Sequence, residues 1–449
     1  MSDTPEKLIC GQCDLVLEIP RKEGHFVGYC PRCHNAVHHY RVRPSKVSLC
    51  YALSAIFFMF ATDSLPFISI SAAGIEQGMQ VLDYTTVLGA QDMWAASFII
   101  FLFMQLLPLL TLLTIIAGDL GKILGKRFFF MPLLLKILHF NVEWSMVEVF
   151  MVGILVSLIK LISLVSIQYG AGFWTFFAFA IFYLLAVSRF SEEEMWNFYV
   201  PHTKTPGGRI PESGIRAEPQ DFCACSCCGE ILDIRTETSC HRCGTGIRDR
   251  SSQSLGKTLA FTLAAIVMYI PANIYPMMIT TYLGSDSEST VIDGVIVLWG
   301  MGSYFVASVI LIASIFIPIM KILLLLYLCW SVKKLRKTRN RLFLSVIYRV
   351  VEFIGKWSMV DVFVVAIMAT IVRVQNLMTI YAGSAMISFA AVVILTMIAA
   401  RSFDPRLLWG YGRERKNAGT SRDTEDGTPE DRSPDENAVP ESGKVPHPA

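Results

Sequence analysis

Eight long apolar stretches limit what this 449-residue chain can fold into more than any other feature of its sequence. A helix needs roughly 17–25 largely apolar residues to cross ~30 Å of hydrocarbon, and every stretch has that length. The stretches cover residues 47–69, 94–117, 145–167, 173–189, 257–281, 304–330, 358–380 and 384–401. Only 17% of all residues are charged, whereas soluble domains carry about 25%. The sequence therefore predicts an all-α polytopic membrane protein with eight spanning helices.

The positively charged residues lie on one side of these stretches. Four of the connecting segments contain no lysine or arginine: 70–93, 168–172, 282–303 and 374–383. The connections on the other side are basic, and the last of them carries six such residues from Lys333 to Arg341. Lysine and arginine collect on the cytoplasmic side of a membrane. Both termini are therefore predicted to be cytoplasmic.

A seven-residue motif occurs twice in the chain. WSMVEVF at Trp144–Phe150 returns as WSMVDVF at Trp357–Phe363, an offset of 213 residues. Earlier in each half the offset is 210, as between VLDYTTVL at 81–88 and VIDGVIVL at 291–298. Four crossings return the chain to its starting side. The sequence therefore predicts two tandem four-helix modules of the same topology, related by an axis near the membrane normal.

Eight of the twelve cysteines form four C-x-x-C pairs. The first two pairs, Cys10 with Cys13 and Cys30 with Cys33, are separated by a spacing that is usual for a four-cysteine zinc ribbon. Tetrahedral Zn²⁺ needs four soft ligands, and two such pairs on facing turns supply them. The sequence predicts a structural zinc site here. Four nearby histidines are alternative ligands: His25, His34, His38 and His39.

The second cysteine module has more than one candidate ligand set. Cys225 and Cys228 form an i, i+3 pair within CACSCC, and Cys240 with Cys243 complete a predicted second zinc site. The same run leaves Cys223 or Cys227 open as an alternative ligand. A thiol-redox enzyme is a further alternative, but it predicts one reactive pair near a βαβ pattern. Four thiolates around zinc also leave no position for a substrate.

These patterns divide the chain into predicted units. They are an N-terminal zinc ribbon at 1–46, a first four-helix module at 47–190, a linker with the second ribbon at 191–256, a second four-helix module at 257–403 and a cytoplasmic tail at 404–449. The tail is rich in charged residues, proline, serine and glycine, so we expect most of it to be disordered.

Five ionisable residues lie within or beside the predicted spans, and they form the candidate polar network of a transport site: Glu148, Lys160, Lys321, Asp361 and Arg373. Charges inside a membrane usually face the bundle interior or a wet cavity. Lys160 lies 12 residues beyond Glu148, about 18 Å along a helix, so each carboxylate needs a partner on another helix. Lys321 is the best candidate, and its counterpart in the first half is Thr111.

No motif for nucleotide or nucleic-acid chemistry is present. Gly256-Lys257-Thr258 approaches a phosphate-binding loop, but Ser251 stands where the first glycine is needed. The basic residues at the membrane boundary are explained by topology. The sequence therefore predicts neither a nucleotide nor a nucleic-acid partner, and it predicts that the protein is not an enzyme.

The chain has two C-x-x-C…C-x-x-C modules, each followed by four spans and a PWSM[VIL][DE]VF-like motif, and this doubled arrangement resembles the paraquat-inducible protein A family. The resemblance covers about residues 8–410. It implies a Gram-negative inner-membrane protein that works with a periplasmic MCE-domain protein and with membrane lipids. The family's motif carboxylates match Glu148 and Asp361, and its intramembrane bases match Lys160 and Lys321. Asn141-Val142-Glu143 departs from the family's usual Arg-Pro, which puts a charge relay in the first half in doubt.

Two functions in different classes follow from this resemblance. The leading one is a subunit that loads lipids into an MCE tunnel or receives them from it, with proton coupling through the polar network. The alternative is a membrane anchor for the MCE partner that transports nothing. The first predicts that the charges within the spans are essential, and the second predicts that only the outer segments are.

Overall fold

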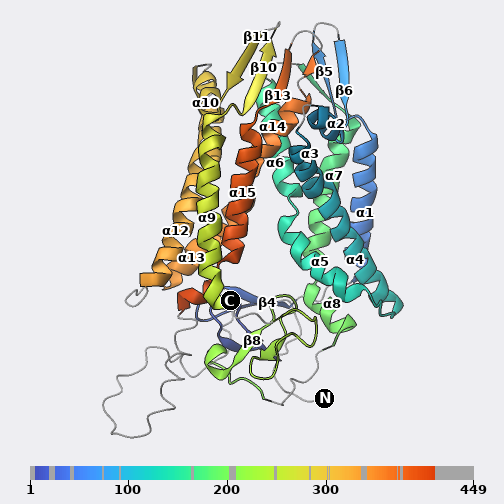
Figure 1. Cartoon of the computed structure of the whole chain (residues 1–449). Coiled ribbons are helices and arrows are strands. Elements are labelled where there is room, and N and C mark those ends of the chain that lie inside the picture. The colour runs from blue at the N-terminus through green and yellow to red at the C-terminus, as the bar shows by residue number, and fades with distance from the viewer. Residues whose placement is uncertain are drawn as a thin grey trace.

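Two helical halves stand side by side in the computed structural model, with small sheets at one end and the cysteine modules at the other (Figure 1). The structure describes residues 6–19, 26–40, 45–72, 75–90, 93–162, 166–201, 209–246, 250–282, 285–300, 302, 304–334, 341–371, 373–374 and 378–409. The predicted tail beyond residue 409 lies outside this part.

The element order of the first half recurs in the second, as the sequence repeat predicts. The first half contains α1 (Ser45–Ser64), β5 (Ile68–Ala72), β6 (Ile75–Met79), α2 (Asp83–Ala90), α3 (Trp94–Phe101), η1 (Leu102–Leu106), α4 (Leu107–Leu124), α5 (Met131–Trp144), α6 (Val147–Ile162), β7 (Ser166–Tyr169), α7 (Ala171–Arg189) and α8 (Glu192–Tyr199). The second half contains α9 (Arg250–Ile274), β10 (Met278–Tyr282), β11 (Ser285–Ser289), α10 (Val291–Gly300), α11 (Tyr304–Leu311), η3 (Ile312–Phe316), α12 (Ile317–Lys334), α13 (Arg341–Trp357), α14 (Val360–Ile371), β12 (Arg373–Val374), β13 (Met378–Ala382), α15 (Ala385–Ser402) and η4 (Pro405–Trp409).

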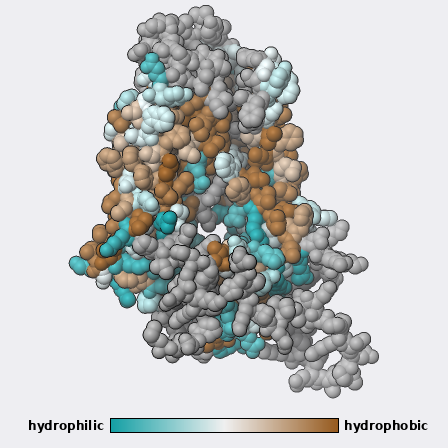
Figure 2. Space-filling model, turned by 180° about the vertical axis from the view of Figure 1, so that it is seen from behind, coloured by the Kyte–Doolittle hydropathy of each residue, from teal (hydrophilic) through white to brown (hydrophobic). Residues whose placement is uncertain are grey.

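Seven helical segments in the described part of the chain are long and apolar enough to cross a membrane. They are Ser45–Ser64, Trp94–Leu124, Met131–Leu158, Ala171–Arg189, Ser254–Ile274, Ile312–Val332 and Ala385–Ser402. The predicted stretch 358–380 differs, because its helix α14 has only 12 residues, about 18 Å of length. Hydrophobic side chains cover the middle of both halves in the view of Figure 2, as lipid contact requires.

The repeated motif marks a break between two helices. α5 ends at Trp144 and α6 begins at Val147, and the second copy lies between α13 and α14 in the same way. Ser145 between them has an extended backbone, with ψ of 118°. The third helical segment therefore begins at Met131 rather than at residue 145 as predicted, and the motif lies inside it. Glu148 and Asp361 consequently belong to the first turn of the helix that follows each break.

A π-helical turn lies at the same place in both halves. η1 and η3 each end immediately before the helix that contains Pro108 or Pro318 at its second position. Proline has no N–H to donate within a helix, and a π turn is one way in which a helix accommodates an altered bonding pattern. Thr111 and Lys321 follow these prolines by three residues, so the candidate polar position lies next to an irregular helix in each half.

Two small antiparallel sheets close the end of the bundle opposite to the cysteine modules (Figure 1). Their strand orders are β6-β5-β7 and β11-β10-β13-β12. The segments without lysine or arginine supply β6, β11 and β13 in full, whereas β12 begins at Arg373. The charge pattern thus grouped these segments at one end, although the strands themselves were not predicted. The sequence predicted that Arg373 lies in one helix with Asp361, and this is wrong. Arg373 lies in β12, because α14 ends at Ile371.

Glycine is required where each sheet leads into the last helix of its half. A Cβ on Gly170 would lie 2.1 Å from the Pro66 carbonyl oxygen, and one on Gly383 would lie 2.0 Å from that of Pro276. The Gly170 amide donates to Phe67 at 3.0 Å. The repeat thus preserves a close approach of two backbones.

The halves meet along α6 and α14. Phe150 and Phe363 are equivalent residues of the repeat, and their rings contact each other edge to face with centroids 5.4 Å apart. Gly153 allows this approach, since a Cβ there would lie 3.2 Å from the Phe363 Cβ. The contact therefore joins the same position of both copies of the repeat.

Candidate functional site: two cysteine quartets and a buried lysine

All four C-x-x-C turns have the same backbone hydrogen bonds. In each, the amide of the residue after the second cysteine donates to the carbonyl of the first cysteine, as from Asp14 to Cys10 at 2.9 Å. The four residues at that position all have a positive φ: Asp14, His34, Gly229 and Gly244. His34 is therefore a turn residue, while His25 lies outside the described residues. This turn directs the amides and side chains of both cysteines to one point.

The four turns form two cysteine quartets that could each hold a metal ion. The first quartet is Cys10, Cys13, Cys30 and Cys33, and the second is Cys225, Cys228, Cys240 and Cys243, with the sulfur atoms of each within 4.8 Å of one another. Opposite sulfurs are 3.5–3.6 Å apart. A tetrahedral ion with sulfur ligands at 2.3 Å requires about 3.8 Å, whereas a disulfide requires about 2.05 Å.

The thiols within each quartet influence one another in opposite directions. Hydrogen bonding from Cys10 lowers the pKa of Cys30 and raises that of Cys13, and hydrogen bonding from Cys225 lowers the pKa of Cys243 and raises that of Cys228. Thiolates are the form that binds metal. Cys223, an alternative ligand in the sequence, lies outside the quartet. Cys227 also lies outside the four sulfurs that converge.

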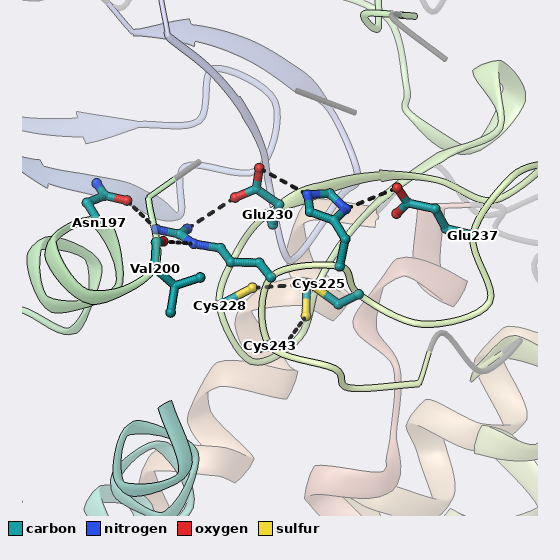
Figure 3. A network of polar contacts seen from close by, with 10 residues as sticks. Asn197, Val200, Cys225, Cys228, Glu230, Glu237 and Cys243 are labelled. Atoms are coloured by element: carbon teal, nitrogen blue, oxygen red, sulfur yellow. Dashed lines mark hydrogen bonds and ion pairs between the residues drawn. The ribbon is translucent and has the colours of Figure 1, made fainter. Parts of the chain in front are cut away.

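The second cysteine module docks on the first helical half through Arg242 (Figure 3). The Arg242 Nε donates to the Val200 carbonyl at 2.8 Å, and Nη2 donates to the Asn197 side chain. Nη1 pairs with the Glu230 carboxylate at 3.1 Å, and the Arg242 side chain is 2% exposed. The guanidinium also lies over the Trp196 ring, 6.0 Å from its centroid. One arginine therefore joins the metal module to the end of α8.

The first cysteine module docks on the second helical half in the equivalent way. Arg32 lies over the Trp409 ring, 4.8 Å from its centroid. Arg349 in α13 donates to the Cys33 carbonyl, and Arg406 pairs with Asp14 at 3.5 Å. Each module therefore docks on the half that does not follow it directly in the sequence.

The repeat also places a basic residue inside a C-x-x-C turn of each quartet. A divalent ion held by four thiolates would carry a net negative charge, and a guanidinium beside it would offset part of that charge. The contacts use residues that the repeat makes equivalent, such as Arg32 and Arg242. Sequence reasoning missed them, although Arg32 and Arg242 share the offset of 210 residues that relates Cys30 to Cys240.

Lys321 is buried inside the second half. The residue is 2% exposed, and its Nζ has no hydrogen-bond partner among the described residues. Three buried hydroxyl residues belong to neighbouring segments of this half: Ser314 in η3, Ser358 in the break after α13 and Thr396 in α15. The side chains of Asp361, Lys160 and Arg373 lie outside the described part of the structure, so the pairing of Lys321 with Asp361 stays a prediction.

The equivalent region of the first half contains Thr111 at the position of Lys321 and Tyr183 at the position of Thr396. The Tyr183 hydroxyl donates to Ser145 in the helix break at 2.7 Å, and Thr111 is fully buried nearby. Glu148 is exposed, although it belongs to the spanning segment Met131–Leu158. An exposed carboxylate at that depth faces a wet space or a polar group more readily than lipid.

Comparison with known proteins supports a transport role. A family model described as paraquat-inducible protein A matches residues 46–199 and 255–411, which correspond to the two helical halves. The chain is 37% identical to the Escherichia coli "Intermembrane transport protein PqiA" over 90% of this chain and 95% of the relative. It is 30% identical to the Escherichia coli "Lipophilic envelope-spanning tunnel protein A", over 89% and 90% respectively. No solved structure matches the chain significantly.

Proposed function

The chain belongs to the paraquat-inducible protein A family, and we propose that it loads lipids or other lipophilic molecules into an MCE tunnel protein, or receives them from it. Its membrane would be the inner membrane of a Gram-negative bacterium, with both termini cytoplasmic. The printed names of the two relatives, which refer to intermembrane transport and to a lipophilic tunnel, support this class of cargo.

The observation that carries the proposal is the pair of broken helices at the repeated motif. An interrupted helix at membrane depth leaves backbone groups that need other partners, and such breaks occur where protein or a water-filled cavity supplies them. Transporters use the ends of such half-helices to hold polar groups of the substrate or coupling ions. Glu148 and Asp361 stand in the first turn after each break, where the helix dipole favours a negative charge.

We infer that zinc is the metal of both cysteine quartets and that it is structural. Four soft thiolates at tetrahedral spacing suit Zn²⁺, and a site with four protein ligands has no open position for catalysis. When bound, the ion holds the two turns of each module together. Arg242 and Arg32 then orient the modules against the helical halves.

We further propose that Lys321 and Asp361 form the charged pair of the transport site, with Glu148 and Lys160 as the weaker counterpart. Lys321 has the burial that such a role needs, and its helix is irregular at η3. A buried ammonium needs a partner, and the proposed partner is Asp361, the acid in the second copy of the repeated motif.

Complementation of envelope defects in a deletion strain tests this function. We expect Lys321→Ala and Asp361→Asn to abolish complementation while protein levels and metal content stay at the parent level. The matched control is Thr111→Ala at the equivalent position of the first half, which should retain most function. If both charge variants complement fully, the chain acts as an anchor for its partner, and deletions in the outer segments 70–93 or 282–303 should then be the inactive ones.

A further inference from the structure

We propose that Gly355 is a positioning residue that makes room for the Lys321 ammonium. We also propose that the larger side chain at the equivalent position of the first half leaves no room for such a charge there. The proposal rests on the proposed function only for what the lysine does in transport. Its packing argument stands on the structure of the two halves.

Gly355 lies in α13, beside the end of the Lys321 side chain. A Cβ built on Gly355 would lie 3.3 Å from the Lys321 Nζ, 3.6 Å from its Cε and 3.8 Å from the Met397 Cγ. The first of these distances is shorter than an ordinary van der Waals contact, and the γ-methyl groups of a valine would add to the conflict. The backbone of Gly355 is helical, so a left-handed conformation does not explain the glycine.

A glycine inside a helix is unfavourable relative to alanine. Gly355 lies in the last turn of α13, which ends at Trp357, and the nearest atoms that a Cβ there would meet belong to Lys321. The lysine extends from α12 towards α13, and the missing side chain at residue 355 leaves the space that its head occupies. Alanine at this position would displace the ammonium slightly, and valine would exclude it.

At the three equivalent positions of the first half, the side chains that are long in the second half are short and those that are small are large. Thr111 is the short counterpart of Lys321, and Val142 is the larger counterpart of Gly355. Tyr183 is the counterpart of Thr396, and its hydroxyl donates to Ser145 at 2.7 Å. Thr396 instead donates to the Val393 carbonyl of its own helix at 2.9 Å.

These positions compensate one another in volume. A short residue at 111 is accompanied by larger residues at 142 and 183, whereas a long residue at 321 is accompanied by smaller residues at 355 and 396. Close packing makes such changes interdependent. The first half is thus filled by a tyrosine, and the second half has room for a charged group.

A double-mutant cycle on the full-length purified protein tests this inference. The four proteins are the parent, Gly355→Val, Lys321→Thr and the double variant, and the measured quantity is the apparent midpoint of thermal unfolding in detergent. Overpacking by valine should lower the midpoint by on the order of 5 °C when lysine is present. In the Lys321→Thr background the same valine should cause no loss, because threonine and valine are the pair that the first half already contains.

Two further variants complete the test. Gly355→Ala should show a smaller loss than Gly355→Val in the parent background, and Val142→Gly should lower the midpoint equally with and without Lys321→Thr. An equal effect of Gly355→Val in both backgrounds would overturn the proposal, since it would mean that the valine conflicts with something other than the lysine. This cycle measures stability alone, so it can succeed or fail whether or not the chain transports lipid.

Discussion

Arg242 should be the side chain on which docking of the second cysteine module most depends. Its guanidinium joins three partners, and removal by Arg242→Ala leaves the Glu230 carboxylate buried, with 7% side-chain exposure. The His241 ring also lies near that carboxylate, with its Nε2 3.8 Å from a Glu230 oxygen. Removal of one member of a buried ion pair costs about 3–5 kcal/mol. We expect the docked state of the module to lose a free energy in that range.

Hydrogen–deuterium exchange of the purified protein measures this loss. Amides of α8 and of the 225–243 module are protected while the module stays docked, so their exchange reports its opening. A loss of 3–5 kcal/mol corresponds to roughly 10²–10⁴-fold faster exchange. Metal content should stay at the parent value, because Arg242 is not a ligand. Arg242→Lys should recover only part of the protection, since an ammonium cannot reproduce the planar fork of a guanidinium.

The matched control is an exposed arginine of the same module. Arg235 pairs with Asp221, and its side chain is 54% exposed. Surface ion pairs contribute about 0–1 kcal/mol, so Arg235→Ala should change exchange by less than about tenfold. If Arg242→Ala accelerated exchange no more than this control, Arg242 would not hold the module, and the argument from its buried contacts would be refuted.

Three other predictions address the metal sites, the axis and the first half. Cys13→Ser should reduce the metal content of purified protein from two ions per chain to one, and Cys227→Ser should leave it unchanged; equal loss from both would contradict the assigned quartet. Gly153→Leu should lower the free energy of unfolding by about 1–3 kcal/mol, because it overpacks against the other half. Gly256→Ala should raise it by about 0.5–1 kcal/mol, since a Cβ there meets no atom within 4 Å. Opposite shifts of the thermal unfolding midpoint are therefore expected for the two variants. Tyr183→Phe should cost about 1 kcal/mol through its lost hydrogen bond, and an unchanged unfolding midpoint would show that this bond contributes nothing.

The parts of the structure that could be predicted are those that follow from local chemistry. Four cysteines at ribbon spacing must converge if they bind one ion, and Cys225 with Cys228 was the only i, i+3 pair in its run. The repeat was visible because both the motif and the prolines recur at nearly constant offset. The lack of lysine and arginine in four segments correctly grouped them at one end, since the distribution of these residues follows the orientation of the spans and does not depend on secondary structure.

The break at the motif was not predicted, because hydropathy reports the length of an apolar run and not its hydrogen bonding. The two residues at the break are Ser145 and Met146, and neither is a glycine or proline that would indicate an interruption. The crossed docking of the modules was also beyond sequence reasoning. Arg349 donates to Cys33 across 316 residues and Arg406 pairs with Asp14 across 392, and no local pattern encodes contacts at such separations.

Because of the crossed docking, each cysteine module connects the two helical halves. The first module ends at β4 (Ala36–Tyr40), and α1 of the first half begins at Ser45, a gap of four residues that spans at most ~14 Å. The same module contacts Arg349 and Trp409 of the second half. It is therefore attached to one half by the chain and to the other by side-chain contacts.

The second module repeats this arrangement with the halves exchanged. Arg242 joins it to α8 of the first half, while the bridge between Ser239 and Gly246 precedes α9 of the second half by only a few residues. At the opposite end the halves meet through Phe150 and Phe363. Any motion that separates the halves at the metal end must therefore undock at least one module or stretch a short connection. Loss of metal from either quartet should loosen both halves together, because each module belongs to both.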